Sequence, residues 1–175
     1  MNRVCLIFLV GMPAAGKTYW GEQIATAYDL AFVDLDTYIS QQENASIPAL
    51  FAQYGEHGFR EREHKYLKKA IKDADGVTIV ACGGGTPFFY DNMSIMKEAG
   101  RVVYLQAETR HLIHNLNDCA DTRPLLKGKG DLATYLDDML QKRRQAYEQA
   151  HYILQTKDIS LTTFAEIISS CTDRP

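Results

Sequence analysis

Gly11-Met12-Pro13-Ala14-Ala15-Gly16-Lys17-Thr18 is the stretch that decides the fold of this 175-residue chain. Its spacing is G-x-x-x-x-G-K-[ST], in which glycines let the backbone turn so that successive N–H groups point at phosphate oxygens. Lys17 would reach the β- and γ-phosphates, and the Thr18 hydroxyl would take a Mg²⁺ ligand position. The alternative interpretation is a glycine turn beside a surface lysine.

The residues on either side of this loop favour phosphate binding. The run 4–10 is apolar and uncharged, which is typical of a buried parallel strand. Residues 19–28 are expected to form a helix, and the N-terminus of a helix favours an anion. A strand before the loop and a helix after it therefore predict a triphosphate site.

Length and composition limit the classes of protein to which the chain can belong. A length of 175 residues predicts a single domain, residues 1–175, with a sizeable core. Hydrophobic residues make up 46% and charged residues 23%, as in ordinary soluble globular proteins. A net charge of −3 argues against a nucleic-acid partner. The apolar run 4–10 is too short to span a bilayer and leads directly into the loop, so neither membrane association nor a cleaved signal is expected.

The four cysteines, Cys5, Cys82, Cys119 and Cys171, lack the paired spacing of a metal site. Two of them fall in or beside predicted core strands, where a free thiol acts as a small apolar side chain. We therefore expect free thiols and a reducing cytoplasm.

Strands alternate with helices along the rest of the chain. Further strands are predicted at 30–33, 77–81, 101–105 and 152–154. Helices are predicted at 37–43, from 46 for a short segment, and at 56–74, 88–99, from 109, 132–150 and 161–169. This alternation predicts a parallel sheet with helices on both faces. Ligands of such sheets bind at the carboxyl ends of the strands.

Two carboxylates, Asp34 and Asp36, follow the strand predicted at 30–33. Residues two apart in an extended chain face the same way. Beside a triphosphate, one carboxylate would hold a Mg²⁺ water and the other would accept a proton from an attacking hydroxyl. Alternatively, Asp36 caps the helix that follows, and the spacing alone does not decide between the two.

The triplet Gly83-Gly84-Gly85 directly follows the strand predicted at 77–81. Three glycines let backbone N–H groups approach a ligand very closely. A plain flexible turn is the alternative, although such a turn seldom needs three glycines in a row.

Glu63 lies on the apolar stripe of the helix predicted at 56–74. A carboxylate on an inward face needs a partner, and Arg60 is within reach one turn earlier. We interpret Glu63 as the group that fixes Arg60. The alternative is an ordinary surface ion pair of little energetic value, which is our interpretation of Arg62.

Two more arginines are candidates for the site. Arg143 is centred on the apolar face of its helix, which is formed by Leu136, Met139, Leu140 and Tyr147, whereas Arg144 lies off it. An arginine so placed either snorkels or points into a polar pocket. Arg123 lies in a polar segment and is stiffened by Pro124. It would stabilise charge on a transferring phosphoryl group from a lid, or it is a solvated loop residue.

These motifs resemble shikimate kinase in order and spacing over essentially the whole chain. They are the phosphate loop, Asp-x-Asp, Phe-Arg-x-x-Glu, Gly-Gly-Gly, Arg-Pro-Leu-Leu and Arg-x-x-x-Tyr. The resemblance implies an α/β P-loop kinase of the nucleoside-monophosphate-kinase class, with a five-stranded parallel sheet flanked by helices and a mobile lid at approximately 117–130. It implies transfer of the γ-phosphate of ATP to the 3-hydroxyl of shikimate, with Mg²⁺, in chorismate and aromatic amino-acid biosynthesis. A cytoplasmic monomer is expected.

The resemblance also implies functions for single residues. Nucleotide contacts would come from Gly11, Ala14, Ala15, Gly16, Lys17, Thr18, Tyr19 and Arg123. The metal would be held by Thr18 and, through water, by Asp34. Asp36 would bind the attacking hydroxyl and act as base, with Lys17 and Arg123 assisting catalysis. Shikimate would be bound by Asp36, Arg60, Gly84 and Arg143, because two arginines suit the two-oxygen geometry of a carboxylate.

The chain departs from the family pattern at several positions. These are Ala14 in place of a glycine, Cys82 in place of Ser or Thr, Tyr19 in place of a small hydroxyl residue, and His114, Asn115 and Asn117 in place of arginines. Two alternative functions are considered. One is phosphorylation of gluconate or a nucleoside monophosphate, against which Phe-Arg-x-x-Glu together with Gly-Gly-Gly argues. The other is nucleotide binding with weak catalysis, for which Ala14 and Cys82 are the only support.

Overall fold

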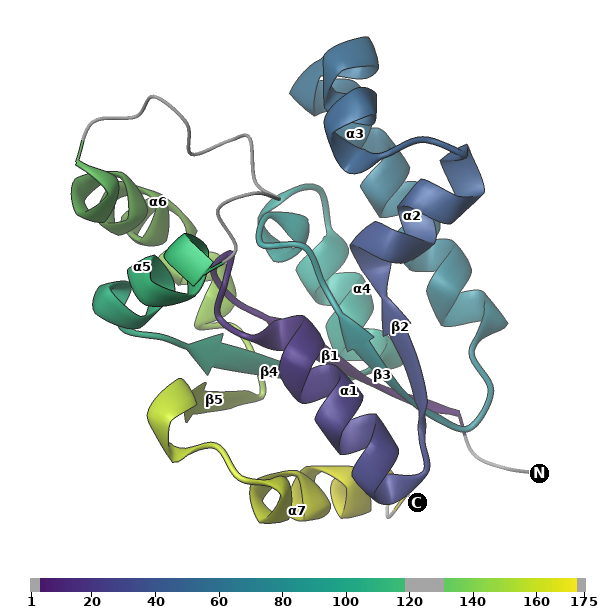
Figure 1. Cartoon of the computed structure of the whole chain (residues 1–175). Helices are drawn as coiled ribbons and strands as arrows, with labels where there is room; N and C mark the ends of the chain where they lie inside the picture. Colours follow the sequence, from purple (N-terminus) through teal and green to yellow (C-terminus); the bar gives the residue numbers. More distant parts are fainter. Residues whose placement is uncertain (1–3, 119–130, 173–175) are drawn as a thin grey trace.

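The computed structural model describes residues 4–118 and 131–172, and its centre is a parallel sheet (Figure 1). The five strands run in the order β2-β3-β1-β4-β5, and every neighbouring pair is parallel. Their bounds are β1 (Cys5–Val10), β2 (Ala31–Asp34), β3 (Val77–Ala81), β4 (Gly100–Gln106) and β5 (Tyr152–Gln155). The predicted five-stranded parallel sheet is therefore confirmed.

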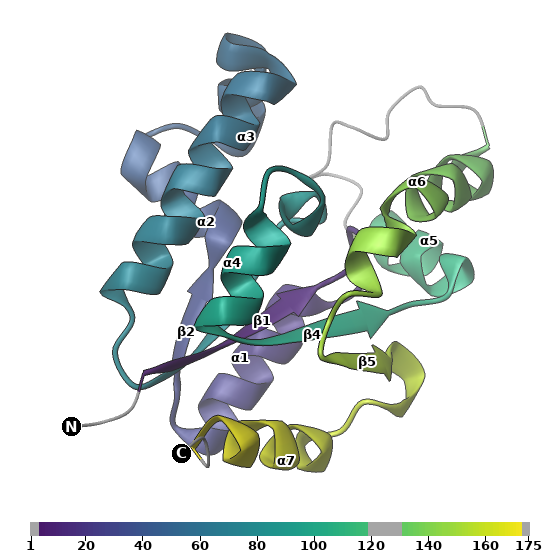
Figure 2. The same cartoon turned by 180° about the vertical axis from the view of Figure 1, so that it is seen from behind.

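Helices connect the strands and cover both faces of the sheet. Their bounds are α1 (Lys17–Tyr28), α2 (Leu35–Glu43), α3 (Ile47–Asp73), α4 (Asn92–Ala99), α5 (Thr109–Asp118), α6 (Leu132–Tyr147) and α7 (Leu161–Thr172). Helices α1 and α4 lie on opposite faces (Figures 1 and 2), and α7 packs beside α1. The first two residues of the predicted lid end α5, and Cys119, Arg123 and the rest of the lid lie outside the described residues.

Strand β1 is buried along its whole length, as its apolar sequence predicts. It pairs with β3 on one side and β4 on the other, so the phosphate loop emerges from the middle of the sheet. The loops that follow β2 and β3 open at the same edge. This arrangement explains why motifs that are distant in the sequence meet at one place.

Two predicted helical segments differ in detail from the structure. The short helix after Ser46 and the helix predicted at 56–74 join end to end as α3, with a kink at Gly55 (φ 66°, ψ −176°). Glycine is suited to this left-handed φ. The segment predicted as helix at 88–99 is helical only from Asn92, because the 3-10 turn Thr86–Phe88 is followed by an extended Phe89 and by Tyr90, which has a left-handed φ of 53°.

The prediction of free thiols is wrong for two of the cysteines. Cys5 on β1 and Cys171 on α7 form a disulfide, although 166 residues separate them. The pairing arises because α7 packs against β1, a contact that local sequence patterns do not reveal. Cys82 is a free, buried thiol, as expected. Within the described ranges, no helix is long and apolar enough to cross a membrane.

Candidate active site

The phosphate loop follows β1 and begins α1. Gly11 has a φ of 145°, and a Cβ there would lie 2.6 Å from the Leu105 carbonyl oxygen of the neighbouring strand. Gly16 has a φ of 85° and forms the N-cap of α1. Ala14 also adopts a left-handed φ, 65°, which is unfavourable for a residue with a side chain. The alanine that replaces the glycine of the family pattern therefore stands at a left-handed position.

Lys17 is buried beneath the loop. Its Nζ donates hydrogen bonds to the carbonyl oxygens of Gly11, at 3.0 Å, and Met12, at 2.8 Å. The first turn of α1 contains no acidic residue, so the positive end of the helix dipole is not neutralised within that turn. A cation, oriented amides and a helix N-terminus together suit a phosphate group.

Thr18 and Asp34 are in contact, as the prediction of a shared metal site requires. The Thr18 hydroxyl donates to Asp34 Oδ2 at 2.7 Å. Asp34 Oδ1 accepts from the Thr37 backbone N–H at 2.9 Å and caps α2. The alternative in which Asp36 is the cap is therefore wrong. The premise that both carboxylates leave an extended chain is also wrong, because Asp36 lies in the first turn of α2.

Asp36 is a partly buried carboxylate with a perturbed pKa. Burial, followed by the nearby charges of Glu63 and Asp34, raises the pKa of this carboxyl to about 6, although Lys17 and Arg60 act in the opposite direction. A Cβ on Gly83 would lie 3.2 Å from Asp36 Oδ1, so the glycine leaves room for this carboxylate. A carboxylate with a pKa near neutrality is suited to proton transfer.

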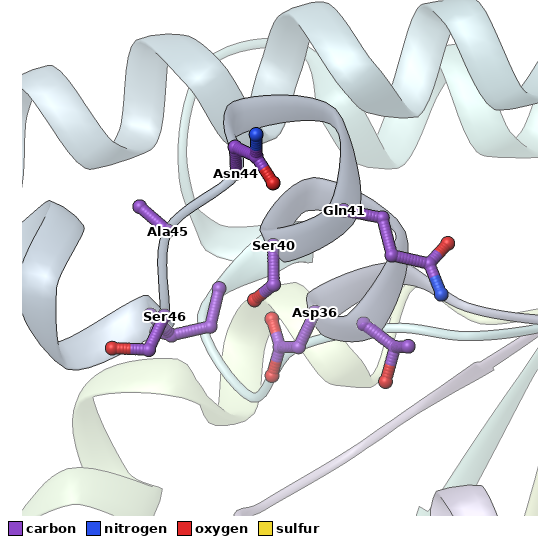
Figure 3. A pocket seen from close by; sticks show the side chains of 8 residues that line it. Asp36, Ser40, Gln41, Asn44, Ala45 and Ser46 are labelled. Atoms are coloured by element: carbon purple, nitrogen blue, oxygen red, sulfur yellow. The ribbon is translucent and has the colours of Figure 1, made fainter.

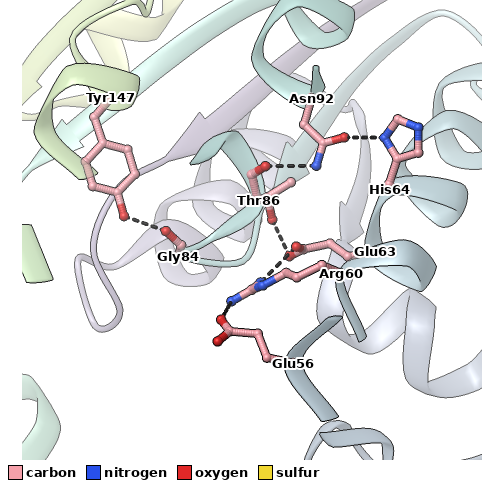
Figure 4. A network of polar contacts seen from close by, with 8 residues as sticks. All are labelled: Glu56, Arg60, Glu63, His64, Gly84, Thr86, Asn92 and Tyr147. Carbon is pink, nitrogen blue, oxygen red and sulfur yellow. Dashed lines mark hydrogen bonds and ion pairs between the residues drawn. The ribbon is translucent and has the colours of Figure 1, made fainter. Parts of the chain in front are cut away.

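Arg60 and Glu63 form the predicted ion pair. Arg60 Nη1 donates to Glu63 Oε2 at 2.8 Å, and Glu63 is fully buried (Figure 4). Glu63 Oε1 accepts from the Thr86 hydroxyl at 2.6 Å, and the Thr86 carbonyl accepts from the Asn92 amide at 2.9 Å. Both carboxylate oxygens of Glu63 are thus occupied, which fixes the position of Arg60.

Arg60 has two nitrogen atoms, Nε and Nη2, that do not bind Glu63. Within residues 4–118 and 131–172, its Nε is the one buried side-chain nitrogen or oxygen that lacks a hydrogen-bond partner. Its Nη2 has a weak contact, 3.4 Å, with the mostly exposed carboxylate of Glu56. Buried polar atoms are normally paired. The unpaired Nε and the weakly paired Nη2 of Arg60 are therefore suited to bind a carboxylate of another molecule.

Steric demands, and not flexibility, explain the three glycines. A Cβ on Gly83 would lie 2.9 Å from Glu63 Oε1, and one on Gly85 would lie 2.5 Å from Arg60 Nη2. A Cβ on Gly84 would lie 2.9 Å from Pro13 Cδ of the phosphate loop. The interpretation as a plain flexible turn therefore loses its support. The triplet lets the phosphate loop and α3 approach each other closely.

Tyr147 connects α6 to this junction. Its hydroxyl donates to the Gly84 carbonyl (Figure 4), and its ring stacks on Tyr104 with 4.9 Å between centroids. Burial raises the pKa of Tyr147, whereas the guanidinium groups of Arg143 and, more weakly, Arg60 lower it. Both arginine charges therefore act on the same hydroxyl, beside Gly84.

The two adjacent arginines of α6 differ as helical geometry predicts. Arg143 is partly buried and interacts with Tyr147. Arg144 is exposed and pairs with Glu148 at 2.6 Å. Arg62 lies outside the junction, where it pairs with Glu43 at 3.1 Å and joins α3 to α2.

A cavity of about 530 Å³ opens beside Asp36 (Figure 3). Its walls come from α2 and the start of α3 and consist of Asp36, Thr37, Ser40, Gln41, Asn44, Ala45, Ser46 and Ile47. Its volume is in the range of small-molecule sites. The lining combines hydroxyl, amide and carboxylate groups with apolar surface, so the cavity suits a small molecule that carries both polar and apolar groups.

Some candidate residues do not contribute a side chain to this junction. Tyr19 is 59% exposed and packs edge-on against Trp20. The Cys82 sulfur lies 3.7 Å from Met96 Sδ, and burial strongly raises the pKa of this thiol, so it belongs to the core. Arg123 lies outside the described residues.

Sequence reasoning missed Glu56, Thr86 and Asn92. Thr86 directly follows the three glycines, which is a usable signal. The positions of Glu56 and Asn92 depend on tertiary contacts and leave no comparable pattern in the sequence.

Comparisons with known proteins agree with this geometry. The family model of shikimate kinase matches residues 13–172. Shikimate kinase of Parabacteroides distasonis is 38% identical over 146 residues, which cover 82% of this chain and 83% of that protein. The crystal structure of shikimate kinase from Bacteroides thetaiotaomicron is 35% identical, with a TM-score of 0.83 over 97% of this chain and 95% of that chain.

A second solved structure, shikimate kinase from Acinetobacter baumannii in complex with shikimate, is 30% identical. Its TM-score is 0.84, and the match covers 98% of this chain and 96% of that chain. Sequence, fold and the paired motifs at the sheet edge thus lead to one conclusion: the chain belongs to the shikimate kinase family.

Proposed function

We propose that this chain transfers the γ-phosphate of ATP to the 3-hydroxyl of shikimate, which gives ADP and shikimate 3-phosphate for chorismate and aromatic amino-acid biosynthesis. The observation that carries the proposal is the junction at the three glycines. There a carboxylate with a raised pKa, Asp36, and a guanidinium with an unpaired N–H, Arg60, meet beside the phosphate loop. Shikimate offers what these groups need, a hydroxyl for the base and a carboxylate for the arginine.

In the proposed reaction, the shikimate oxygen forms a bond to the γ-phosphorus. The bond between that phosphorus and the β–γ bridging oxygen breaks, and ADP leaves with the electron pair. Asp36 takes the proton of the attacking hydroxyl. Lys17 and the amides of the phosphate loop (Gly11, Ala14, Ala15, Gly16, Thr18 and the backbone of Tyr19) hold the triphosphate. Arg123 is proposed to assist from the lid.

Shikimate is proposed to be held by its carboxylate. Arg60 supplies its unpaired Nε and loosely paired Nη2, and Arg143 approaches from the side of Tyr147. The two-oxygen geometry of a carboxylate fits guanidinium donors better than ammonium groups. Gly84 contributes close backbone approach, because Pro13 leaves no room for a side chain at this position.

Thr18 and Asp34 fit a Mg²⁺ ion that depends on ATP. Within the described part of the chain, no group of three or more His, Cys, Asp or Glu residues forms a separate metal site. Mg²⁺ typically uses one or two protein oxygens together with phosphate oxygens and waters. When bound, the ion would neutralise charge on the β- and γ-phosphates. We further propose that the protein is a single-domain monomer, and ATP as donor supports a cytoplasmic location.

An ADP-release assay with ATP, Mg²⁺ and a panel of acceptors tests this proposal. We expect turnover that depends on shikimate, because the site offers both a base and a carboxylate-binding arginine. The panel includes gluconate and nucleoside monophosphates as the alternative acceptors. Turnover driven by either of them, without turnover of shikimate, would show that the substrate is wrong. Nucleotide binding without turnover of any acceptor would favour a weakly catalytic protein.

The raised pKa of Asp36 predicts the pH profile. The base must be ionised, and its pKa is about 6, so kcat/KM for shikimate should rise tenfold per pH unit below about 6 and level off above it. The measurement is a set of initial rates between pH 5 and 8 with saturating MgATP. The residual activity of Asp36→Asn serves as the control, since it retains any titration that belongs to ATP. If kcat/KM of this variant still rises with pH up to about 6, the pH dependence belongs to a group other than Asp36.

A further inference from the structure

Asn115 on α5 contacts the phosphate loop from outside. Its Nδ2 donates to the Ala14 carbonyl oxygen at 2.9 Å, although the two residues are 101 positions apart. Ala14 is the loop residue whose φ, 65°, is unfavourable for any residue with a side chain. The contact therefore falls on the one strained alanine of the anion-binding loop.

The peptide plane between Ala14 and Ala15 is held at both ends. Asn115 binds its carbonyl oxygen, and its N–H donates to the Met12 carbonyl at 3.1 Å. Because a peptide unit is planar, two anchors on opposite sides fix its rotation. That rotation sets ψ of Ala14 and the direction of the N–H groups that follow toward Lys17.

Two other loop carbonyls are held by a residue of the loop itself. Those of Gly11 and Met12 accept from Lys17 Nζ. Lys17 is itself needed by the phosphates, so its hold on the loop weakens when it turns toward a nucleotide. The bond from Asn115 does not involve a group that binds phosphate. It can persist through nucleotide binding.

We propose that Asn115 is a positioning residue for nucleotide binding, which holds the phosphate loop in its anion-binding conformation by fixing the strained Ala14–Ala15 peptide. A loop that occupies the competent conformation only part of the time binds with an affinity lowered by that fraction. Asn115 thus compensates for an alanine at a left-handed position. The inference rests on the proposed function only in that the loop binds a nucleotide.

The test is the dissociation constant for ADP, measured by calorimetry without shikimate, in Asn115→Ala. One neutral hydrogen bond corresponds to about a 2- to 12-fold change, so we expect ADP binding to weaken by that factor. KM for ATP should rise similarly, with KM for shikimate and the melting temperature unchanged. Asn117→Ala is the matched control, because Asn117 is exposed on the same helix and its side chain makes no hydrogen bond to another described residue.

The Ala14→Gly background separates positioning from a general structural effect. Glycine adopts the left-handed φ without steric cost, so Asn115→Ala should weaken ADP binding less in this background. Ala14→Gly alone should bind ADP at least as tightly as the natural chain, with part of the gain offset by glycine entropy. Three results would overturn the proposal: wild-type affinity in Asn115→Ala, an equal loss in both backgrounds, or an equal rise in KM for shikimate. Because ADP binding is measured without an acceptor, a wrong substrate assignment leaves this test intact.

Discussion

Replacing Asp36 with asparagine is expected to lower kcat by about 10²- to 10⁴-fold, the usual contribution of a positioned base. Asparagine keeps the size and hydrogen-bonding ability of the side chain but cannot accept the proton of the attacking hydroxyl. KM for ATP should change little, because the nucleotide is proposed to be held by the phosphate loop. Steady-state kinetics with both substrates varied provide the measurement.

The fold of the Asp36→Asn variant should be intact. The pKa of Asp36 is raised to about 6, so above that pH the ionised carboxylate is less favourable in the folded protein than in the unfolded chain. Removing the charge should leave the melting temperature at pH 8 equal or higher. Asp34→Ala is the informative contrast, because it removes the oxygen that caps α2 and should lower the melting temperature. An unchanged kcat in Asp36→Asn would contradict the assignment of the base.

Features that depend on neighbouring residues could be predicted from the sequence. The apolar run 4–10 identified β1. The spacing of Gly11 and Gly16 to Lys17 and Thr18 identified the phosphate loop. The pair of Arg60 and Glu63 followed from one helical turn on an apolar stripe. Each of these depends on a local period or a fixed spacing, which a single sequence displays.

Features that depend on tertiary packing could not be predicted from the sequence. Asp36 is a plausible cap from its spacing, and only the end of β2 at Asp34 and the start of α2 at Leu35 show that Asp34 is the cap. The disulfide of Cys5 and Cys171 requires knowledge that α7 returns to β1. The bond from Asn115 to Ala14 likewise joins α5 to the phosphate loop across the sheet edge. No periodicity in the sequence encodes such contacts.

Replacing Arg143 with alanine should raise KM for shikimate at least about tenfold, because a hydrogen bond between charged groups contributes roughly 1.5–3 kcal/mol. KM for ATP should change much less, since the proposed partner of Arg143 is the shikimate carboxylate. Arg143→Lys should recover only part of the affinity, because lysine keeps the charge but lacks the planar fork. Initial rates at saturating MgATP, with shikimate varied, measure the effect.

Arg144 is the control for Arg143, because the two arginines are adjacent and differ only in the direction in which their side chains leave α6. Arg143 and Tyr147 are four residues apart on one face of α6, and Arg144 and Glu148 form the same pair on the adjacent face, about 100° around the helix. The first pair reaches Gly84 through the Tyr147 hydroxyl, whereas the second lies in solvent, where an ion pair contributes little. Arg144→Ala should therefore resemble the natural chain in both KM values. A larger shikimate effect at Arg144 than at Arg143 would mean that the carboxylate binds on the solvent face of α6, away from Arg60, and the proposed pair of arginines would have to be abandoned.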